Sequence, residues 1–196
     1  MRAVLASKNA HKLKEIAKIT EQFGMELVLQ SELGLDLDPE ENGSTFEENS
    51  LIKAKAVMEA AGMTAIADDS GLMVDALGGE PGIYSARYGG ECCKNDKERY
   101  EYLLRKLDNV PDEQRTAKFV SVITLIHPDG STVVARGECP GRILREARGE
   151  NGFGYDPVFF VEEDGKTMAE MSAERKNEIS HRARALQALA RKLGGE

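Results

Sequence analysis

The sequence has little positive charge, few cysteines and no long apolar run, and each shortage disfavours a class of protein. Its 26 Lys and Arg residues against 34 Asp and Glu residues give a net charge of −8. Such a surface repels a polyphosphate backbone, so a general nucleic-acid binder is disfavoured. The three cysteines, Cys92, Cys93 and Cys139, form neither a metal-binding pair nor an even disulfide set. We therefore expect reduced thiols.

Long apolar segments are also missing. The apolar run at 158–161 is far too short to cross a bilayer, and the N-terminus reaches Lys8 too early for a signal peptide. We therefore expect a cytoplasmic protein that does not contact a membrane. The 196 residues are 41% hydrophobic and 31% charged. This composition predicts a globular protein of about one domain, or one domain divided into two lobes.

Apolar periodicity predicts an α/β fold with no internal repeat and no linker. Strands are expected at 2–6, 27–29, 65–67, 119–126, 132–135 and 158–161. Helices are expected at 13–23, at 46–61, from Asn95 to 107, and at 179–193 before Gly194 and Gly195. Thr45 and Glu48 have the spacing of a capping box at the start of the second helix. The strands on either side of 127–130 read as a hairpin, which indicates antiparallel pairing in part of the sheet.

A first candidate site lies between the first strand and the first helix. Its residues are Ser7, Lys8, Asn9, Ala10, His11 and Lys12. Backbone N–H groups at a helix start, together with lysines, can bind phosphate oxygens. A capped helix with basic residues in solvent is the alternative. Lysines in the first turn oppose the helix dipole, however, so Lys12 needs another reason to be there, and an anionic ligand would supply one.

A second candidate site consists of carboxylates. Asp68 and Asp69 stand at the end of a predicted buried strand, where α/β sheets open into a ligand crevice. Two adjacent acids repel each other unless a cation or donor neutralises them. Mg²⁺ needs only one or two carboxylates besides waters and phosphates, and Glu40 and Glu41 are further candidates. Alternatively, Asp68 and Asp69 are turn and cap residues.

Two more segments offer contacts to a ligand. The glycine-rich loop 149–157 lets the backbone approach a ligand, and Phe153 or Tyr155 could stack on a base. Near the predicted start of the last helix, Ser180, His181 and Arg182 follow Lys176 by about one turn. Donors of this kind can hold phosphate or read the carbonyl oxygens of a heterocycle.

Six motifs in order carry a resemblance over nearly the whole chain. They are Ser7-x-Asn9-x-x-Lys12, Thr45-Phe46-x-Glu48-Asn49, Ala67-Asp68-Asp69-Ser70-Gly71-Leu72, Gly78-Gly79-x-Pro81-Gly82-x-Tyr84-Ser85-Ala86-Arg87-Tyr88, Gly152-Phe153-Gly154-Tyr155-Asp156-Pro157 and Ser180-His181-Arg182. The chain resembles the inosine/xanthosine triphosphate pyrophosphatase family. The resemblance implies one domain over residues 1–196, with an elongated mixed sheet flanked by helices and two lobes around a central cleft. It also implies a homodimer and Mg²⁺-dependent hydrolysis of nonstandard purine nucleoside triphosphates to the monophosphate and pyrophosphate.

The resemblance also implies roles for individual residues. Asp69 is implied as proton acceptor and metal ligand, and Glu40, preferred over Glu41, as the second metal ligand. The implied substrate contacts are Ser7, Lys8, Asn9, Ala10, His11, Lys12, Ser70, Phe153, Gly154, Tyr155, Asp156, Lys176, His181 and Arg182. Two alternatives stay open: a Maf-type nucleotide pyrophosphatase with a different base pocket, and a catalytically silent module that binds nucleotide or RNA.

Overall fold

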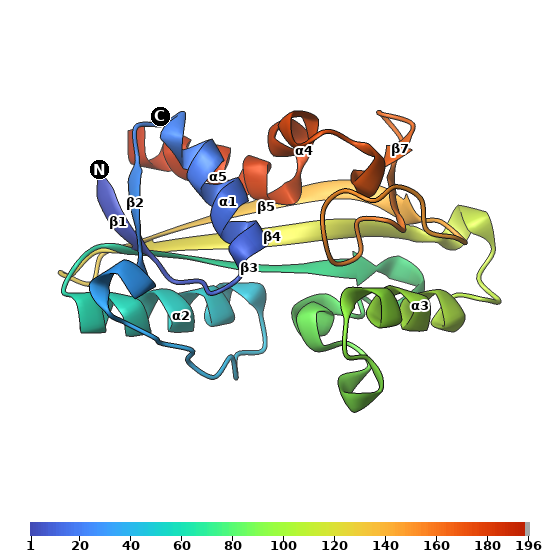
Figure 1. Cartoon of the computed structure of the whole chain (residues 1–196), viewed down its shortest axis with the longest axis horizontal. Helices are drawn as coiled ribbons and strands as arrows, with labels where there is room; N and C mark the ends of the chain where they lie inside the picture. Colours follow the sequence, from blue (N-terminus) through green and yellow to red (C-terminus); the bar gives the residue numbers. More distant parts are fainter. Residues whose placement is uncertain (195–196) are drawn as a thin grey trace. The chain divides into compact units, whose positions relative to one another are not determined.

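The computed structural model describes residues 1–194, which form a mixed α/β fold (Figure 1). The strands are β1 (Arg2–Leu5), β2 (Glu26–Leu29), β3 (Ala65–Val74), β4 (Thr116–Ile126), β5 (Thr132–Ile143), β6 (Phe159–Val161) and β7 (Lys166–Thr167). The α-helices are α1 (Ala10–Glu21), α2 (Phe46–Ala61), α3 (Asp96–Lys106), α4 (Ala173–Ile179) and α5 (His181–Gly194). Short 3₁₀ helices are η1 (Gln30–Leu33), η2 (Asp75–Leu77), η3 (Gly82–Arg87), η4 (Gly90–Cys92), η5 (Asp112–Gln114) and η6 (Met168–Glu170).

The strands form a seven-stranded sheet in the order β2-β1-β3-β4-β5-β6-β7. β1 pairs in parallel with β2 and β3, whereas β6 pairs antiparallel with β5 and β7. The predicted mixed sheet is therefore confirmed. The turn at 127–131 joins β4 to its neighbour β5, as the hairpin prediction required.

The chain divides into two compact units. The first contains Met1–Ser70, Ser121–Gly137 and the described chain from His181 onward; the second contains Gly71–Val120 and Glu138–Ser180. β3, β4 and β5 each contribute residues to both units.

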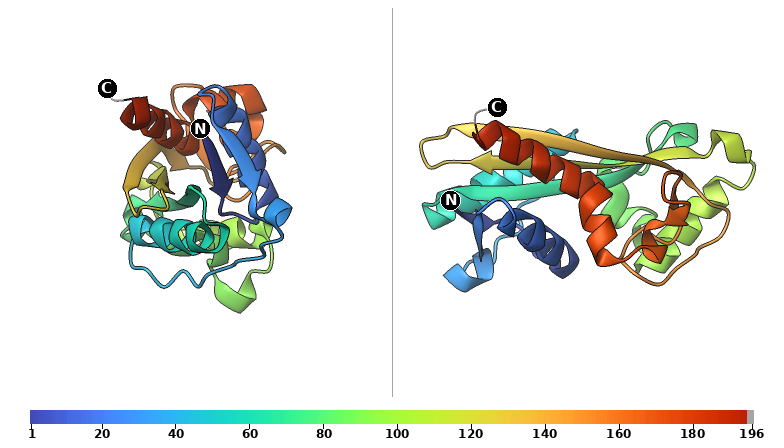
Figure 2. Two further views of the ribbon diagram at one scale, coloured as in Figure 1. Left: turned by 90° about the vertical axis from the view of Figure 1, so that its left-hand side faces the viewer. Right: turned by 90° about the horizontal axis from the view of Figure 1, so that it is seen from above.

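In the first unit, helices cover both faces of the sheet. α1 and α5 lie together on one face and α2 lies on the other (Figures 1 and 2). Ile16 of α1 and Leu186 of α5 pack in one buried cluster with Ile66 of β3. Ala54 and Val57 of α2 form another buried cluster with β1 and β3 residues. Each helix is thus held by its apolar stripe, as the periodicity predicted.

The second unit has a core of its own. Its cluster of buried residues includes Leu103 of α3, Phe119 of β4 and Phe159 of β6. The rings of Phe119 and Phe159 lie with their centroids 4.4 Å apart.

No helix within residues 1–194 combines the length and the apolar character that crossing a membrane requires. The three cysteines, all among the described residues, form no disulfide.

Helix capping follows the sequence closely. Thr45 Oγ1 accepts a hydrogen bond from Glu48 N at 3.1 Å, and Asn95 Oδ1 accepts one from Glu98 N at 2.9 Å. Gly62, in the left-handed region with φ +63°, ends α2. Gly194 and Gly195 were predicted to end the last helix. Gly194 is the last residue of α5, and Gly195 lies outside the described residues.

Two predictions about local structure were wrong. Asp68 and Asp69 do not end a strand or form a turn, because β3 continues through them to Val74. The last helix does not begin at residue 179 but at His181: Ile179 and Lys176 belong to α4, and Ser180, with ψ 158°, separates α4 from α5. The apolar spacing of 179–193 continues across this break, so periodicity alone could not reveal it.

Candidate active site

Asp68 and Asp69 are adjacent buried carboxylates on β3 that pair with cations from opposite faces of the sheet. Successive side chains of a strand point to opposite faces. Asp68 pairs with Lys12 of α1 and Arg182 of α5, the two helices on one face. Asp69 pairs with Lys53 of α2, on the other face. Because each carboxylate has its own cations, the two acids can be neighbours in a buried strand.

Both oxygens of Asp68 are fully engaged. Oδ1 accepts hydrogen bonds from Ser70 Oγ at 2.5 Å and Ser121 Oγ at 2.6 Å. Oδ2 lies 2.9 Å from Lys12 Nζ and 3.4 Å from Arg182 Nη2. Burial acts to raise the pKa of Asp68, but Lys12, Arg182 and the two hydroxyls outweigh it and hold that pKa well below its usual range. Asp68 is therefore ionised at neutral pH.

Asp69 differs because only one of its oxygens is used. Oδ1 accepts a hydrogen bond from Lys53 Nζ at 2.9 Å. Oδ2 is buried and has no hydrogen-bond partner among residues 1–194. Burial raises the pKa of Asp69 to about 6, although Lys53 acts to lower it. Buried polar atoms are almost always satisfied, so the open oxygen indicates a place for a cation or a water molecule.

Lys53, which pairs with Asp69, was not predicted from the sequence as a site residue. Its Nζ also donates to the carbonyl oxygen of Asp68 at 3.0 Å and lies 3.2 Å from Glu41 Oε1. Burial acts to lower the pKa of Lys53, but the charges of Asp69 and Glu41 outweigh it and raise that pKa. One signal could have revealed the residue: Lys53 stands four residues from the buried Asn49 and Val57, on the inward face of α2.

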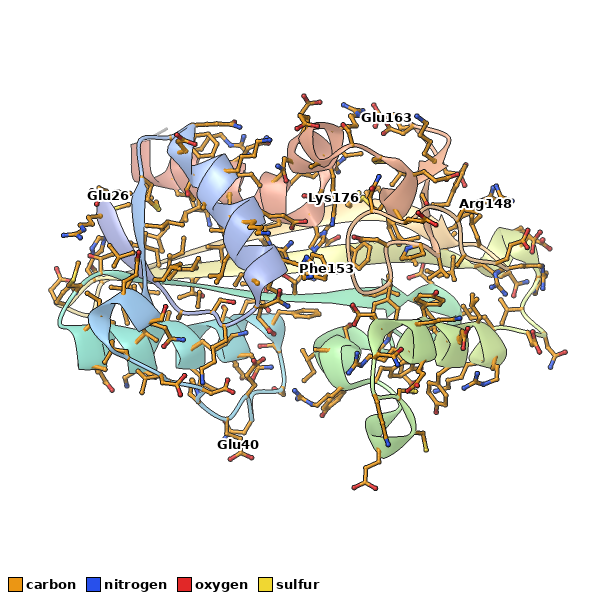
Figure 3. The ribbon with its side chains drawn as sticks, viewed as in Figure 1. Glu26, Glu40, Arg148, Phe153, Glu163 and Lys176 are labelled. Carbon is orange, nitrogen blue, oxygen red and sulfur yellow. The ribbon has the colours of Figure 1, made fainter. Side chains whose placement is uncertain are left out.

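The structure separates the adjacent Glu40 and Glu41. Glu41 pairs with Lys53, which also binds Asp69, so Glu41 lies next to the Asp69 centre. Glu40 is exposed and points away from the ribbon (Figure 3). Within residues 1–194, no group of three or more His, Cys, Asp or Glu side chains is arranged to hold a metal ion.

The first backbone N–H groups of α1 are hydrogen-bonded to the residue that caps the helix. Asn9 is the N-cap, and its Oδ1 accepts from His11 N at 3.0 Å and from Lys12 N at 3.1 Å. Asn9 N in turn donates to Ser7 Oγ at 3.2 Å. The expected strand, loop and helix are thus present, with the first N–H groups of the helix bonded to the cap.

The lysines of this segment differ in their surroundings. Lys12 has a side chain only 17% exposed and paired with Asp68, so the alternative of a solvated helix residue is wrong for it. Lys8 is exposed and lies 2.8 Å from Asp36 Oδ1. Ala10, the first residue of α1, is also exposed.

Arg182 is buried at the start of α5, where it contacts several partners. It pairs with Glu15 of α1 and with Asp68, and its Nη2 donates to Ser70 Oγ at 3.2 Å. Gly137 of β5 makes this close packing feasible: a Cβ there would lie 2.3 Å from the His181 carbonyl oxygen and 2.2 Å from a backbone nitrogen of α5. Glycine alone leaves room for the helix start at this distance.

In the second unit, Asp156 organises the loop 149–157. Its Oδ2 accepts from Phe153 N at 2.9 Å and from Lys176 Nζ at 2.7 Å. Lys176 Nζ also lies 4.7 Å from the centroid of the Phe153 ring; both residues are labelled in Figure 3. Three residues of the sequence prediction therefore form one cluster.

The remaining loop residues are held by other partners. Tyr155 is buried, and its hydroxyl donates to the Ser85 carbonyl oxygen at 2.7 Å. Gly154 N donates to Asp96 Oδ2 at 2.8 Å. Of the two aromatic rings proposed for stacking on a base, Phe153 is therefore the accessible one, because Tyr155 belongs to the core.

Fold and site together define an α/β protein with a carboxylate and lysine centre suited to an anionic ligand. The chain belongs to the Ham1 family, which matches residues 3–192. A dITP/XTP pyrophosphatase of Haemophilus influenzae is 52% identical over 192 residues, 97% of each chain. The structure of the Staphylococcus aureus Ham1 protein matches with a TM-score of 0.88 and 48% identity, over 100% of this chain and 99% of that one. A HAM1 protein from Coxiella burnetii matches with a TM-score of 0.89 and 40% identity, over 100% of each chain.

Proposed function

We propose that this chain is a Mg²⁺-dependent enzyme that hydrolyses the nonstandard purine nucleoside triphosphates ITP, dITP and XTP to the monophosphate and pyrophosphate. Membership of the Ham1 family and the similarity to a relative named dITP/XTP pyrophosphatase support this substrate class. The structural observation that carries the proposal is the open Oδ2 of Asp69, a buried carboxylate oxygen beside Lys53.

Asp69 is the proton acceptor in this proposal. A pKa of about 6 leaves its carboxylate mostly ionised at neutral pH, while keeping it basic enough to take a proton from an attacking water. Lys53 occupies Oδ1, so the proton from the water would pass to Oδ2. The water oxygen forms a bond to phosphorus as the P–O bond that links the α and β phosphates breaks, which gives the monophosphate and pyrophosphate.

Mg²⁺ is the proposed cofactor, held by Asp69 with Glu40 or Glu41. Two carboxylates are enough, because Mg²⁺ completes its octahedral shell with waters and substrate phosphate oxygens. The open Oδ2 of Asp69 has two lone pairs, so it could contact such an ion with one and still accept the proton with the other. When bound, the ion would neutralise the negative charge that develops on the leaving pyrophosphate.

The two glutamates can be compared directly as metal ligands, each serving as the control for the other. Glu40→Gln and Glu41→Gln keep the side-chain size and remove the charge. The variant that affects the ion should need a higher Mg²⁺ concentration for half-maximal activity and should bind Mn²⁺ more weakly in water proton relaxation without substrate. If neither variant changes either measurement, the glutamates are not ligands.

In this proposal, the residues that bind the triphosphate differ from those that contact the purine base. Lys8 and Lys12 supply local positive charge for the triphosphate in a chain whose net charge is −8. His181, Arg182 and Lys176 are donors, which suit the carbonyl oxygen at position 6 of hypoxanthine and xanthine. Adenine presents an amino group there, and a buried donor facing a donor costs about 1–3 kcal/mol. The ring of Phe153 offers a face for stacking on the base.

We also propose that the enzyme is a cytoplasmic homodimer that binds neither membranes nor nucleic acid. Light scattering of the purified protein tests the dimer: a mass near that of one 21.5 kDa chain would contradict it.

Product analysis tests the proposed reaction. With ITP and Mg²⁺, we expect IMP and pyrophosphate in equal amounts, and chelation of the metal should stop their release. IDP and inorganic phosphate as products would contradict the reaction. A preference for modified pyrimidine triphosphates would favour the Maf-type alternative, and tight binding without turnover would favour a silent binding module.

A further inference from the structure

Lys12 and Arg182 converge on a single atom, Oδ2 of Asp68. The Lys12 Nζ is 2.9 Å and the Arg182 Nη2 is 3.4 Å from this oxygen. Asp68 and Arg182 are each 2% exposed or less. The two cations come from helices at opposite ends of the sequence, α1 and α5, and they share one buried negative charge.

The other oxygen fixes the orientation of this carboxylate. Oδ1 of Asp68 accepts from Ser70 Oγ on β3 and from Ser121 Oγ on β4. Ser121 is fully buried and has no place in the proposed chemistry. Two short hydrogen bonds on Oδ1 therefore hold Oδ2 in line with both cations.

Arg182 is anchored a second time. Its Nη1 pairs with Glu15, which lies three residues after Lys12 on α1. Both terminal nitrogens of the guanidinium thus have carboxylate partners, and a planar group held at both ends cannot rotate to suit a different acceptor pattern.

We propose that Asp68 is a positioning residue that couples Lys12 to Arg182. This inference rests on the proposed function, which assigns Lys12 to the triphosphate and Arg182 to the base. A triphosphate that binds Lys12 shares the charge of this lysine with Oδ2, while Asp68 keeps Lys12 in place; Oδ2 then attracts Arg182 more strongly and holds it more firmly. Triphosphate binding therefore sharpens the discrimination between bases, and by linkage a matching base favours triphosphate binding.

The coupling separates the roles of the two aspartates. Asp69 has one oxygen open for the reaction, whereas both oxygens of Asp68 are bonded to protein groups. Asp68 acts through Lys12 and Arg182, so its loss should change substrate affinity and base preference together.

The test compares three variants with the parent enzyme. Asp68→Asn removes the shared charge. Ser121→Ala keeps that charge but removes one of the hydrogen bonds that orient it. Thr124→Val is the matched control, because Thr124 stands on the same strand and its buried hydroxyl bonds to Ser50 at 2.6 Å rather than to Asp68.

The main readout is the ratio of kcat/KM for ITP to kcat/KM for ATP. We expect Asp68→Asn to lower this ratio about tenfold or more and to raise KM for ITP, and Ser121→Ala to lower the ratio about threefold, as loss of one hydrogen bond would. Thr124→Val should leave the ratio unchanged. Unchanged ratios in both Asp68→Asn and Ser121→Ala would overturn the proposal. Should Asp68→Asn not fold, Ser121→Ala against Thr124→Val decides alone.

A binding measurement separates this proposal from the proposed function. Calorimetry with tripolyphosphate, which has no base, probes the lysine site without turnover. We expect weaker binding in Asp68→Asn and Ser121→Ala than in Thr124→Val. Equal or tighter binding would mean that Asp68 only masks the charge of Lys12. A parent enzyme that releases no pyrophosphate from ITP contradicts the proposed function instead, whatever the tripolyphosphate result.

Discussion

Lys53 Nζ lies 2.9 Å from Oδ1 of Asp69, and this contact leaves Oδ2 of the same buried carboxylate open. The positive charge of Lys53 stabilises the ionised form of Asp69. It contacts only Oδ1, so Oδ2, the oxygen that the proposed reaction requires, stays open. The opposing effects of burial and of Lys53 on the pKa of Asp69 lead to the first three predictions.

Asp69→Asn should abolish most of the activity while the fold persists. Asparagine keeps the shape of the side chain but cannot accept the proton or give the metal a negative charge. Turnover of ITP should fall by about 10²–10⁴-fold, the contribution typical of a general base. Pyrophosphate release measures the effect. More than a tenth of the parent activity, with unchanged thermal unfolding, would remove Asp69 from the role of proton acceptor.

The same variant should be more stable than the parent when no metal is present. Burial raises the pKa of Asp69 from 3.8 to about 6, so the folded state binds the proton more tightly than the unfolded state does. The contribution of Asp69 to stability is therefore present at low pH and is lost as the pH rises through about 6.

Thermal unfolding in a chelator measures this stability difference. At neutral pH, Asp69→Asn should unfold at least about 2 °C higher than the parent, a shift that corresponds to about 1 kcal/mol in a chain of this size. Near pH 4 the difference should disappear. Excess Mg²⁺ should then stabilise the parent and not the variant. A variant less stable than the parent at neutral pH would mean that the ionised Asp69 is well accommodated.

Lys53→Met should move the acid limb of the pH profile to higher pH. The Lys53 charge lowers the pKa of Asp69, so its removal should leave the acid more protonated at a given pH. The profile of kcat/KM for ITP against pH measures the shift. Lys55→Met is the matched control, because Lys55 is an exposed residue of the same helix that faces Glu59. A lower activity with an unshifted profile would make Lys53 a substrate contact only.

Lys12→Ala should mainly weaken binding of the triphosphate. A point charge on a phosphate acts in the ground state as well as in the transition state, so KM for ITP should rise more than kcat falls. Lys14→Ala is the control, since Lys14 is exposed on the same helix. Equal KM values for the two variants at low salt would assign Lys12 to the fold alone.

Much of the fold could be predicted from local signals in the sequence. α2 has a capping threonine, a regular apolar stripe and a terminating Gly62, and its predicted bounds are those observed. β3 could not be predicted fully, because two adjacent acids followed by Ser70 and Gly71 have the composition of a turn. Only cations from distant segments allow Asp68 and Asp69 to lie inside a strand.

The candidate site shows the same limit. Lys12 and Asp69 were found from their places beside predicted strands, and the structure places both in ion pairs. Lys53 was missed because a lysine in a helix usually faces solvent. Only its tertiary contacts with Asp69 and Glu41 identify it as part of the candidate site. Gly137 was missed because its requirement comes from the backbone of α5, which is remote in sequence.

The most direct test of the proposed function is kcat/KM for pyrophosphate release from ITP, dITP and XTP, measured beside ATP and GTP with Mg²⁺ present. The donors proposed to contact the base, His181, Arg182 and Lys176, predict that kcat/KM for ITP, dITP and XTP exceeds that for ATP by about 10²-fold or more. Values for ATP equal to or above those for ITP would contradict the assignment.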